Sequence, residues 1–138
     1  MATQADLARA WMQKGDSDRL NAERTVQSAG PCDTACFHCQ QAVEKYLKAV
    51  LAFAGQPIPR THDLEEVYNQ CLAVAPALSL DGTELSILTP YAVQLRYDAD
   101  FWPDQGTARQ ALDVANRVRA AVLTVLPRSA WPPGDGGS

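Results

Sequence analysis

Over residues 35–64 the chain reads ACFHCQQAVEKYLKAVLAFAGQPIPRTHDL. The pattern predicts a long amphipathic helix, a break from Gly55 to Pro59 and the start of another helix near Thr61. Apolar side chains recur at three- and four-residue spacing, which places them on one arc of a helix that turns about 100° per residue. This apolar arc comprises Cys36, Cys39, Val43, Tyr46, Leu47, Val50, Leu51 and Ala54.

The opposite side of the same helix carries a polar and mostly basic stripe, formed by His38, Gln41, Lys45 and Lys48. Two interpretations are open. The stripe could hold a phosphate, or it could simply face solvent, with Glu44 and Lys48 as an ordinary pair four residues apart. We favour the solvent-facing interpretation, because most polar helix faces only meet water.

Length and composition describe one domain of ordinary character, with 138 residues and a net charge of -4. The acidic balance argues against non-specific binding to long duplex nucleic acid, although a small basic patch for a nucleotide or one RNA strand is compatible with it. The chain contains no run of about 18 apolar residues, so no membrane span is expected. The N-terminus does not resemble a signal peptide, so a cytoplasmic location is expected.

Five helices are predicted, and no run of alternating β-branched residues predicts a strand. The helices cover about residues 3–28, 33–54, 61–74, 79–97 and 104–126. Two positions weaken the pattern: Gly15 and the polar residues after it allow a bend or break, and Pro90 allows a kink or a late helix start. The prediction is an all-α, up-and-down bundle of four to five helices over residues 1–126, followed by a flexible tail rich in proline and glycine over residues 127–138.

The cysteines lie where a metal cluster could be suspected, because His38 stands between Cys36 and Cys39. On a helix, however, the two cysteines lie on the apolar arc and the histidine points more than about 100° away from them. One tetrahedral zinc ion could not collect these ligands without breaking the helix. We therefore expect no metal and no cofactor, and we expect small, buried thiols in a reducing compartment.

Several motifs resemble the HEPN family (higher eukaryotes and prokaryotes nucleotide-binding), and they stand in that family's order. FHCQQAVEKYLKAVL at residues 37–51 is similar to the signature of its second helix, and THDL at residues 61–64 is similar to the start of its third. WMQKGDSDRLNA at residues 11–22 resembles its first helix loosely. LRYDADFW at residues 95–102 falls where the family carries an element rich in arginine and tyrosine.

The resemblance implies a helical bundle that acts in the cytoplasm, often as a homodimer, and is often encoded beside a minimal nucleotidyltransferase in a toxin–antitoxin-like pair. Other members are metal-independent ribonucleases with an Arg-x(4–6)-His motif. Counted from Arg96, the positions for that histidine hold Phe101, Trp102 and Pro103. A nuclease of this kind needs an imidazole near the scissile phosphate, so the catalytic interpretation is poorly supported.

Two further residues are candidates for a phosphate site. Arg96 stands at the position where the family carries its functional arginine, and a guanidinium binds oxyanions bidentately. An ion pair of Arg96 with Asp98 or Asp100 is equally compatible with the sequence. His62 lies at a helix N-terminus, where free N–H groups attract anions. We favour a capping role for Thr61 and Asp63, and for His62 a structural role and a binding role are both open. We expect Arg96, His62 and the lysines of the stripe to approach one another.

The preferred function is a non-catalytic nucleotide-binding or partner module that works with a minimal nucleotidyltransferase. The alternative is a ribonuclease of the same fold with an atypical site. A homodimer is expected, because a small bundle is poorly able to bury all of its large aromatic side chains alone. The dimer contact is expected near Trp11, Phe101 or Trp102.

Overall fold

The structure of this protein, a computed structural model, describes residues 1–134 and contains helices but no strand within that range. Its elements are α1 (Gln4–Gln27), α2 (Cys32–Phe53), α3 (Leu64–Val74), α4 (Gly82–Leu88), α5 (Tyr91–Tyr97), α6 (Gln105–Val125) and the 3-10 helix η1 (Arg128–Ala130). The predicted all-α bundle is confirmed.

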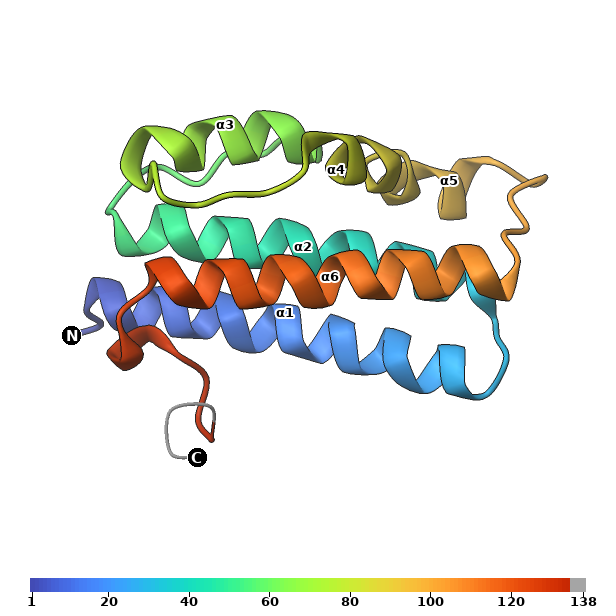
Figure 1. The fold of residues 1–138 in the computed structure, drawn as a ribbon, viewed down its shortest axis with the longest axis horizontal. Coiled ribbons are helices and arrows are strands. Elements are labelled where there is room, and N and C mark those ends of the chain that lie inside the picture. The colour runs from blue at the N-terminus through green and yellow to red at the C-terminus, as the bar shows by residue number, and fades with distance from the viewer. Residues whose placement is uncertain (135–138) are drawn as a thin grey trace.

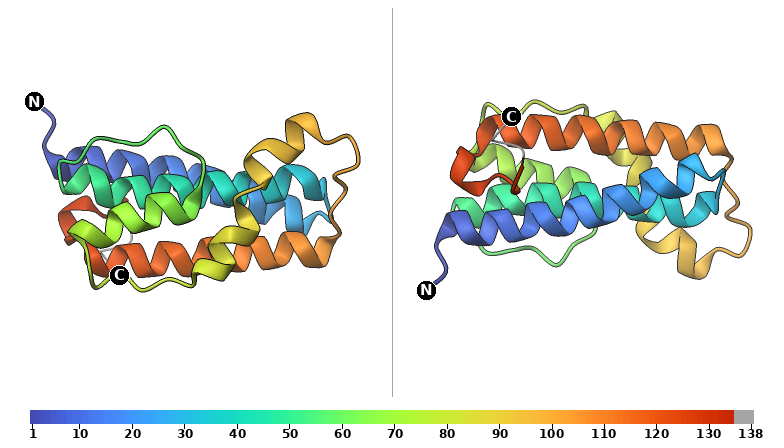
Figure 2. Two further views of the ribbon diagram at one scale, coloured as in Figure 1. Left: turned by 90° about the horizontal axis from the view of Figure 1, so that it is seen from above. Right: turned by 90° about the horizontal axis from the view of Figure 1, so that it is seen from below.

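Helix α2 lies at the centre of the bundle, with α1 and α6 along its length and the shorter helices α3, α4 and α5 over its remaining side (Figure 1). The chain runs up α1 and down α2, and the loop over residues 54–63 leads it back to the start of α3 (Figures 1 and 2). Helix α3 runs beside α2 in the same direction, so that His62 lies next to Glu44 and Cys71 next to Leu47. Helices α4 and α5 then run up, and α6 runs down. Because α2 has neighbours on most sides, most of its residues are buried. Polar side chains on α2 can therefore meet other helices rather than water.

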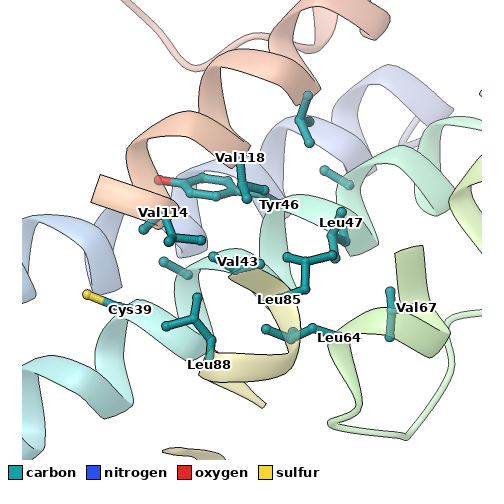
Figure 3. Packing of buried hydrophobic residues seen from close by; sticks show 14 of the residues in the cluster. Cys39, Val43, Tyr46, Leu47, Leu64, Val67, Leu85, Leu88, Val114 and Val118 are labelled. Carbon is teal, nitrogen blue, oxygen red and sulfur yellow. The ribbon is translucent and has the colours of Figure 1, made fainter. Parts of the chain in front are cut away.

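The core is one cluster of aliphatic and small residues with Tyr46 of α2 among its largest fully buried side chains. In Figure 3 the ring of Tyr46 lies close to Val114 and Val118 of α6. Fully burying a side chain of this size contributes on the order of 2 kcal/mol from its apolar area. The position also brings the phenol oxygen to the junction of α1, α2 and α6.

Helix α1 is continuous through the segment where the sequence allowed a bend or break. A Cβ atom at Gly15 would lie only 2.6 Å from Cε1 of Tyr46, so glycine is required here for a close approach rather than for a break. Asp16 and Asp18 also have partners on neighbouring helices, which hold this part of α1 in place. Tertiary contacts thus override the weak local helix propensity.

Pro90 divides the predicted fourth helix into α4 and α5. Asp81 caps α4 by accepting a hydrogen bond from the Thr83 backbone, as the sequence pattern indicates. At α3 the cap is Asp63, which accepts hydrogen bonds from the backbone of Glu65 and Glu66, rather than Thr61. The sequence could not choose between these neighbouring cap candidates.

The chain after α6 is held more firmly than the sequence predicts. η1 follows α6 directly, and the indole N–H of Trp131 donates to the carbonyl oxygens of Leu123 at 3.1 Å and Leu126 at 3.0 Å. Such carbonyls at a helix C-terminus lack partners within the helix, so the indole satisfies them. These contacts join the first part of the predicted flexible tail to α6, and the last residues of the tail, 135–138, lie outside the described residues.

Within the described part of the chain, none of the helices has the length and apolar character that crossing a bilayer requires.

We predict that Gly15→Ala lowers the free energy of unfolding by about 1–3 kcal/mol, because the added methyl group collides with the buried ring of Tyr46. An ordinary glycine-to-alanine change inside a helix would instead stabilise by about 1 kcal/mol. The matched control is Gly106→Ala in α6, whose Cβ would lie 3.5 Å from Asp104 Oδ1, an ordinary contact. Urea denaturation measures both variants, and equal behaviour of the two would contradict the close approach.

Candidate functional site

Two carboxylates from different parts of the fold pair with the basic side chains of the stripe predicted on α2. The first is Asp18 of α1. Its Oδ1 lies 2.8 Å from Nδ1 of His38, and its Oδ2 lies 2.5 Å from Nζ of Lys45. Since a carboxylate only accepts hydrogen bonds, both α2 side chains donate to it.

The second carboxylate is Glu44, on α2 itself. Its Oε2 lies 2.8 Å from Nζ of Lys48, and its Oε1 lies 2.7 Å from Nδ1 of His62. The side chains of Glu44 and Lys48 are only 5% and 9% exposed. The interpretation of this pair as an ordinary ion pair on a solvent-facing surface is therefore wrong, because neighbouring parts of the fold cover this part of α2.

Two glutamines extend the Glu44 cluster. Gln40 is fully buried, and its amide donates to Glu44 Oε1 at 3.4 Å and to the backbone oxygen of His62 at 3.3 Å. The amide of Gln41 in turn donates to Gln40 Oε1 at 2.6 Å. The chain of amides fixes the segment before α3 against α2.

These contacts control the ionisation of both carboxylates. Burial acts to raise the pKa of Glu44, but hydrogen bonds from Lys48 and His62 outweigh it and hold the pKa below its ordinary value. Burial likewise opposes ionisation of Asp18, and hydrogen bonds from His38 and Lys45 lower its pKa. Both carboxylates are therefore charged near neutral pH and neutralise the basic side chains that they contact.

A third polar cluster, on the other side of α1, was not predicted from the sequence. The hydroxyl of Tyr46 donates to Asp16 Oδ1 at 2.6 Å, and Arg119 of α6 donates to both oxygens of Asp16 at 2.7 and 3.1 Å. Arg19 donates to the Tyr46 oxygen at 3.2 Å. Burial and the bond to Asp16 raise the pKa of Tyr46 far above its ordinary value, so the phenol stays protonated.

Arg96 is the one predicted phosphate-binding residue that lies outside α2 and the segment before α3. It is exposed near the end of α5, and no hydrogen bond or ion pair among the described residues joins it to Lys45, Lys48 or His62. The predicted ion pairs with Asp98 or Asp100 are not formed either within residues 1–134.

The three aromatic residues predicted near a dimer contact have different surroundings. Phe101 packs against Tyr91 of α5, with ring centroids 5.4 Å apart. Trp11 lies beneath the ammonium group of Lys48, which is 5.7 Å from its ring centroid. Trp102 is 76% exposed. Only Trp102 therefore offers most of its side chain to a partner.

The thiols behave as the sequence predicts. Cys36, Cys39 and Cys71 are buried, and burial raises the pKa of each to about 12. Such thiols are protonated at neutral pH and are poor nucleophiles. Within residues 1–134, no group of three or more His, Cys, Asp or Glu side chains is placed to hold a metal ion.

Comparison with known proteins agrees with this architecture. A family model described as HEPN domain matches residues 8–125. The fold is similar to the crystal structure of TT1696 from Thermus thermophilus, with a TM-score of 0.73 and 23% sequence identity over 86% of this chain and 98% of that one. At that identity the likeness concerns the fold. A search of curated protein sequences found no match.

We predict that Glu44→Gln lowers the free energy of unfolding by about 3 kcal/mol at pH 7, because it leaves the buried ammonium of Lys48 without a carboxylate. The double variant Glu44→Gln, Lys48→Met removes both charges and should recover at least half of the loss. The pKa of Glu44 is depressed in the fold. Its contribution is therefore complete above the ordinary value of 4.5 and disappears as the pH falls through the lower folded value.

The difference between Glu44→Gln and the native protein should shrink accordingly on acidification. Chemical denaturation at several pH values measures it. A pH-independent difference, or a loss below about 1 kcal/mol at pH 7, would show that the pair is solvated.

Proposed function

Since this chain belongs to the HEPN family, we propose that it is a non-catalytic member that serves as a binding module for a protein partner, with a minimal nucleotidyltransferase as the expected kind of partner. The proposal rests on the hydrogen-bonding partners of the two histidines. His38 is held by Asp18 and His62 by Glu44, and neither forms a pair with Arg96 among the described contacts.

The chemistry of RNA cleavage explains why this matters. Transfer of a proton near the scissile phosphate needs a group that titrates near neutral pH, and arginine cannot supply it. The positions that follow Arg96 at the family's spacing hold Phe101, Trp102 and Pro103. Phe101 is packed on Tyr91, so even this position is used for structure.

The lysines of the stripe on α2 are already paired with carboxylates, which argues against a nucleotide there and favours a protein partner. Lys45 and Lys48 already contact carboxylates at 2.5 and 2.8 Å, so a phosphate would have to displace Asp18 or Glu44 to bind them. Binding of a phosphate there should therefore be weak, about millimolar, which corresponds to about -4 kcal/mol. It should also weaken with added salt.

A homodimer is part of the proposal. Exposed apolar side chains concentrate on α4, α5 and the loop after them: Ile87, Val93, Tyr97 and Trp102 are 57%, 52%, 79% and 76% exposed. Of the three aromatics expected near the contact, Trp102 belongs to this surface. A cluster of exposed apolar side chains is typical of an interaction surface, and twofold pairing is the commonest way to cover one.

We predict that the purified protein does not cleave RNA in the presence of a chelator, because no imidazole accompanies Arg96 among the described residues. Incubation with a labelled single-stranded RNA and gel analysis checks this. The ribonuclease alternative would require metal-independent cleavage that disappears in Arg96→Ala. The variants His38→Ala and His62→Ala would then identify the substitute for the missing histidine.

We predict that light scattering at micromolar concentration gives about twice the chain mass of 15.0 kDa. The double variant Val93→Asp, Trp102→Ser should shift the protein toward the monomer, since it places a charge and a polar group on the proposed contact. The control is Trp11→Phe, which changes an aromatic outside this surface. A monomer mass for the native protein would contradict the dimer.

A further inference from the structure

Helix α1 forms an edge of the bundle and keeps one face without a partner. Figures 1 and 2 show α1 on the side of α2 away from α3. The 3-10 helix η1 contacts α1 near its start, where Arg9 donates to the backbone oxygen of Ser129. Exposed residues follow this face at alternating spacings of three and four: Leu7, Ala10, Lys14, Ser17, Asn21 and Arg24. We call this set the outer stripe of α1. It spans about 26 Å at roughly 1.5 Å per residue.

Two surface hollows lie along the outer stripe. One, of about 430 Å³, is lined by Leu7, Ala10, Trp11, Lys14 and Lys45. The other, of about 300 Å³, is lined by Ser17, Leu20, Asn21, Arg24 and Thr25. The first is mainly apolar and the second mainly polar. Small side chains at Ala10 and Ser17 leave the backbone of α1 open to close approach by another helix.

The charge of the outer stripe is positive, although the whole chain is acidic. Lys14 and Arg24 are exposed and have no ion pair with any described residue. The carboxylates of α1 are all engaged by cations: Asp6 by Arg9, Asp16 by Arg119, Asp18 by Lys45 and Glu23 by Arg19. The stripe itself contains no carboxylate.

This charge pattern indicates which kind of partner binds the outer stripe of α1. A second copy of the chain, packed through the same surface about a twofold axis, would bring Lys14 and Arg24 of both copies into one interface. The partly exposed carboxylates that flank the stripe, Asp6 and Glu23, are already paired with Arg9 and Arg19. A partner helix with an apolar seam and flanking carboxylates would instead be complementary. Such helices commonly dock in grooves through anchors at spacings of three and four residues.

We propose that the outer stripe of α1 docks an acidic amphipathic helix of a partner protein. An apolar anchor of that helix fills the hollow beside Leu7 and Trp11, and its carboxylates pair with Lys14 and Arg24. The inference rests on the proposed role as a binding module and adds the surface and the chemistry of the partner. It places the partner on a different side of the molecule from the proposed dimer contact.

The test uses two labelled synthetic helical peptides of about 18 residues, which is long enough to follow the stripe. Both carry leucine at helical spacing, and they differ only in having glutamate or lysine on the flanks. Fluorescence anisotropy against the full-length protein is expected to give about tenfold tighter binding for the glutamate peptide. The double variant Lys14→Glu, Arg24→Glu should weaken that binding about tenfold or more, whereas Arg60→Glu, an exposed control outside the stripe, should not.

Three outcomes would overturn the proposal. The first is equal binding of the two peptides, or no binding of either. The second is binding that the double variant leaves unchanged. The third is tighter binding of a short single-stranded RNA than of the glutamate peptide, which would assign the stripe to nucleic acid. These outcomes are independent of the ribonuclease assay, so failure here can be told from failure of the proposed non-catalytic role.

Discussion

The contact between Tyr46 and α1 is the constraint on which the rest of the structure depends. The ring occupies the space that a side chain at Gly15 would fill, and the hydroxyl reaches Asp16, which also binds Arg119 of α6. One side chain of α2 thereby sets the separation of α1 and α2 and connects both to α6. The protonated phenol donates to the carboxylate, so the buried oxygen atoms are satisfied.

The same close approach determines the character of the candidate site. With α1 held against α2, Asp18 reaches His38 and Lys45, while Glu44 meets Lys48 and His62 beneath the segment that leads to α3. The polar face of α2 thus stabilises helix packing. A face that looks basic on a helical wheel becomes nearly neutral in the fold. The exposed cations without an ion pair among the described residues lie elsewhere, at Lys14, Arg24, Arg60, Arg96 and Arg109.

The sequence predicts those features that depend on local periodicity and fails on those that depend on tertiary partners. The helices, the all-α bundle and the family follow from the spacing of residues such as Val43 and Leu47 and from the motif over residues 37–51. A helical wheel cannot show that Asp18 of another helix neutralises Lys45. It also cannot show that Gly15 is a packing contact. The sequence contains one signal for both features: Asp16 and Asp18 follow Gly15 on a helix that packs against the lysine-bearing helix α2.

We infer that the polar side chains of α2 hold the fold together through Asp18 and Glu44 and do not bind a nucleotide. The most direct test of this inference is a titration of the isotope-labelled protein with ATP, followed by NMR signals of the side chains of His38, Lys45 and Lys48. These signals should not move at micromolar ATP and should shift at most weakly at about millimolar concentrations. Saturable shifts of all three at micromolar ATP would contradict the inference and would make this face of α2 a nucleotide site.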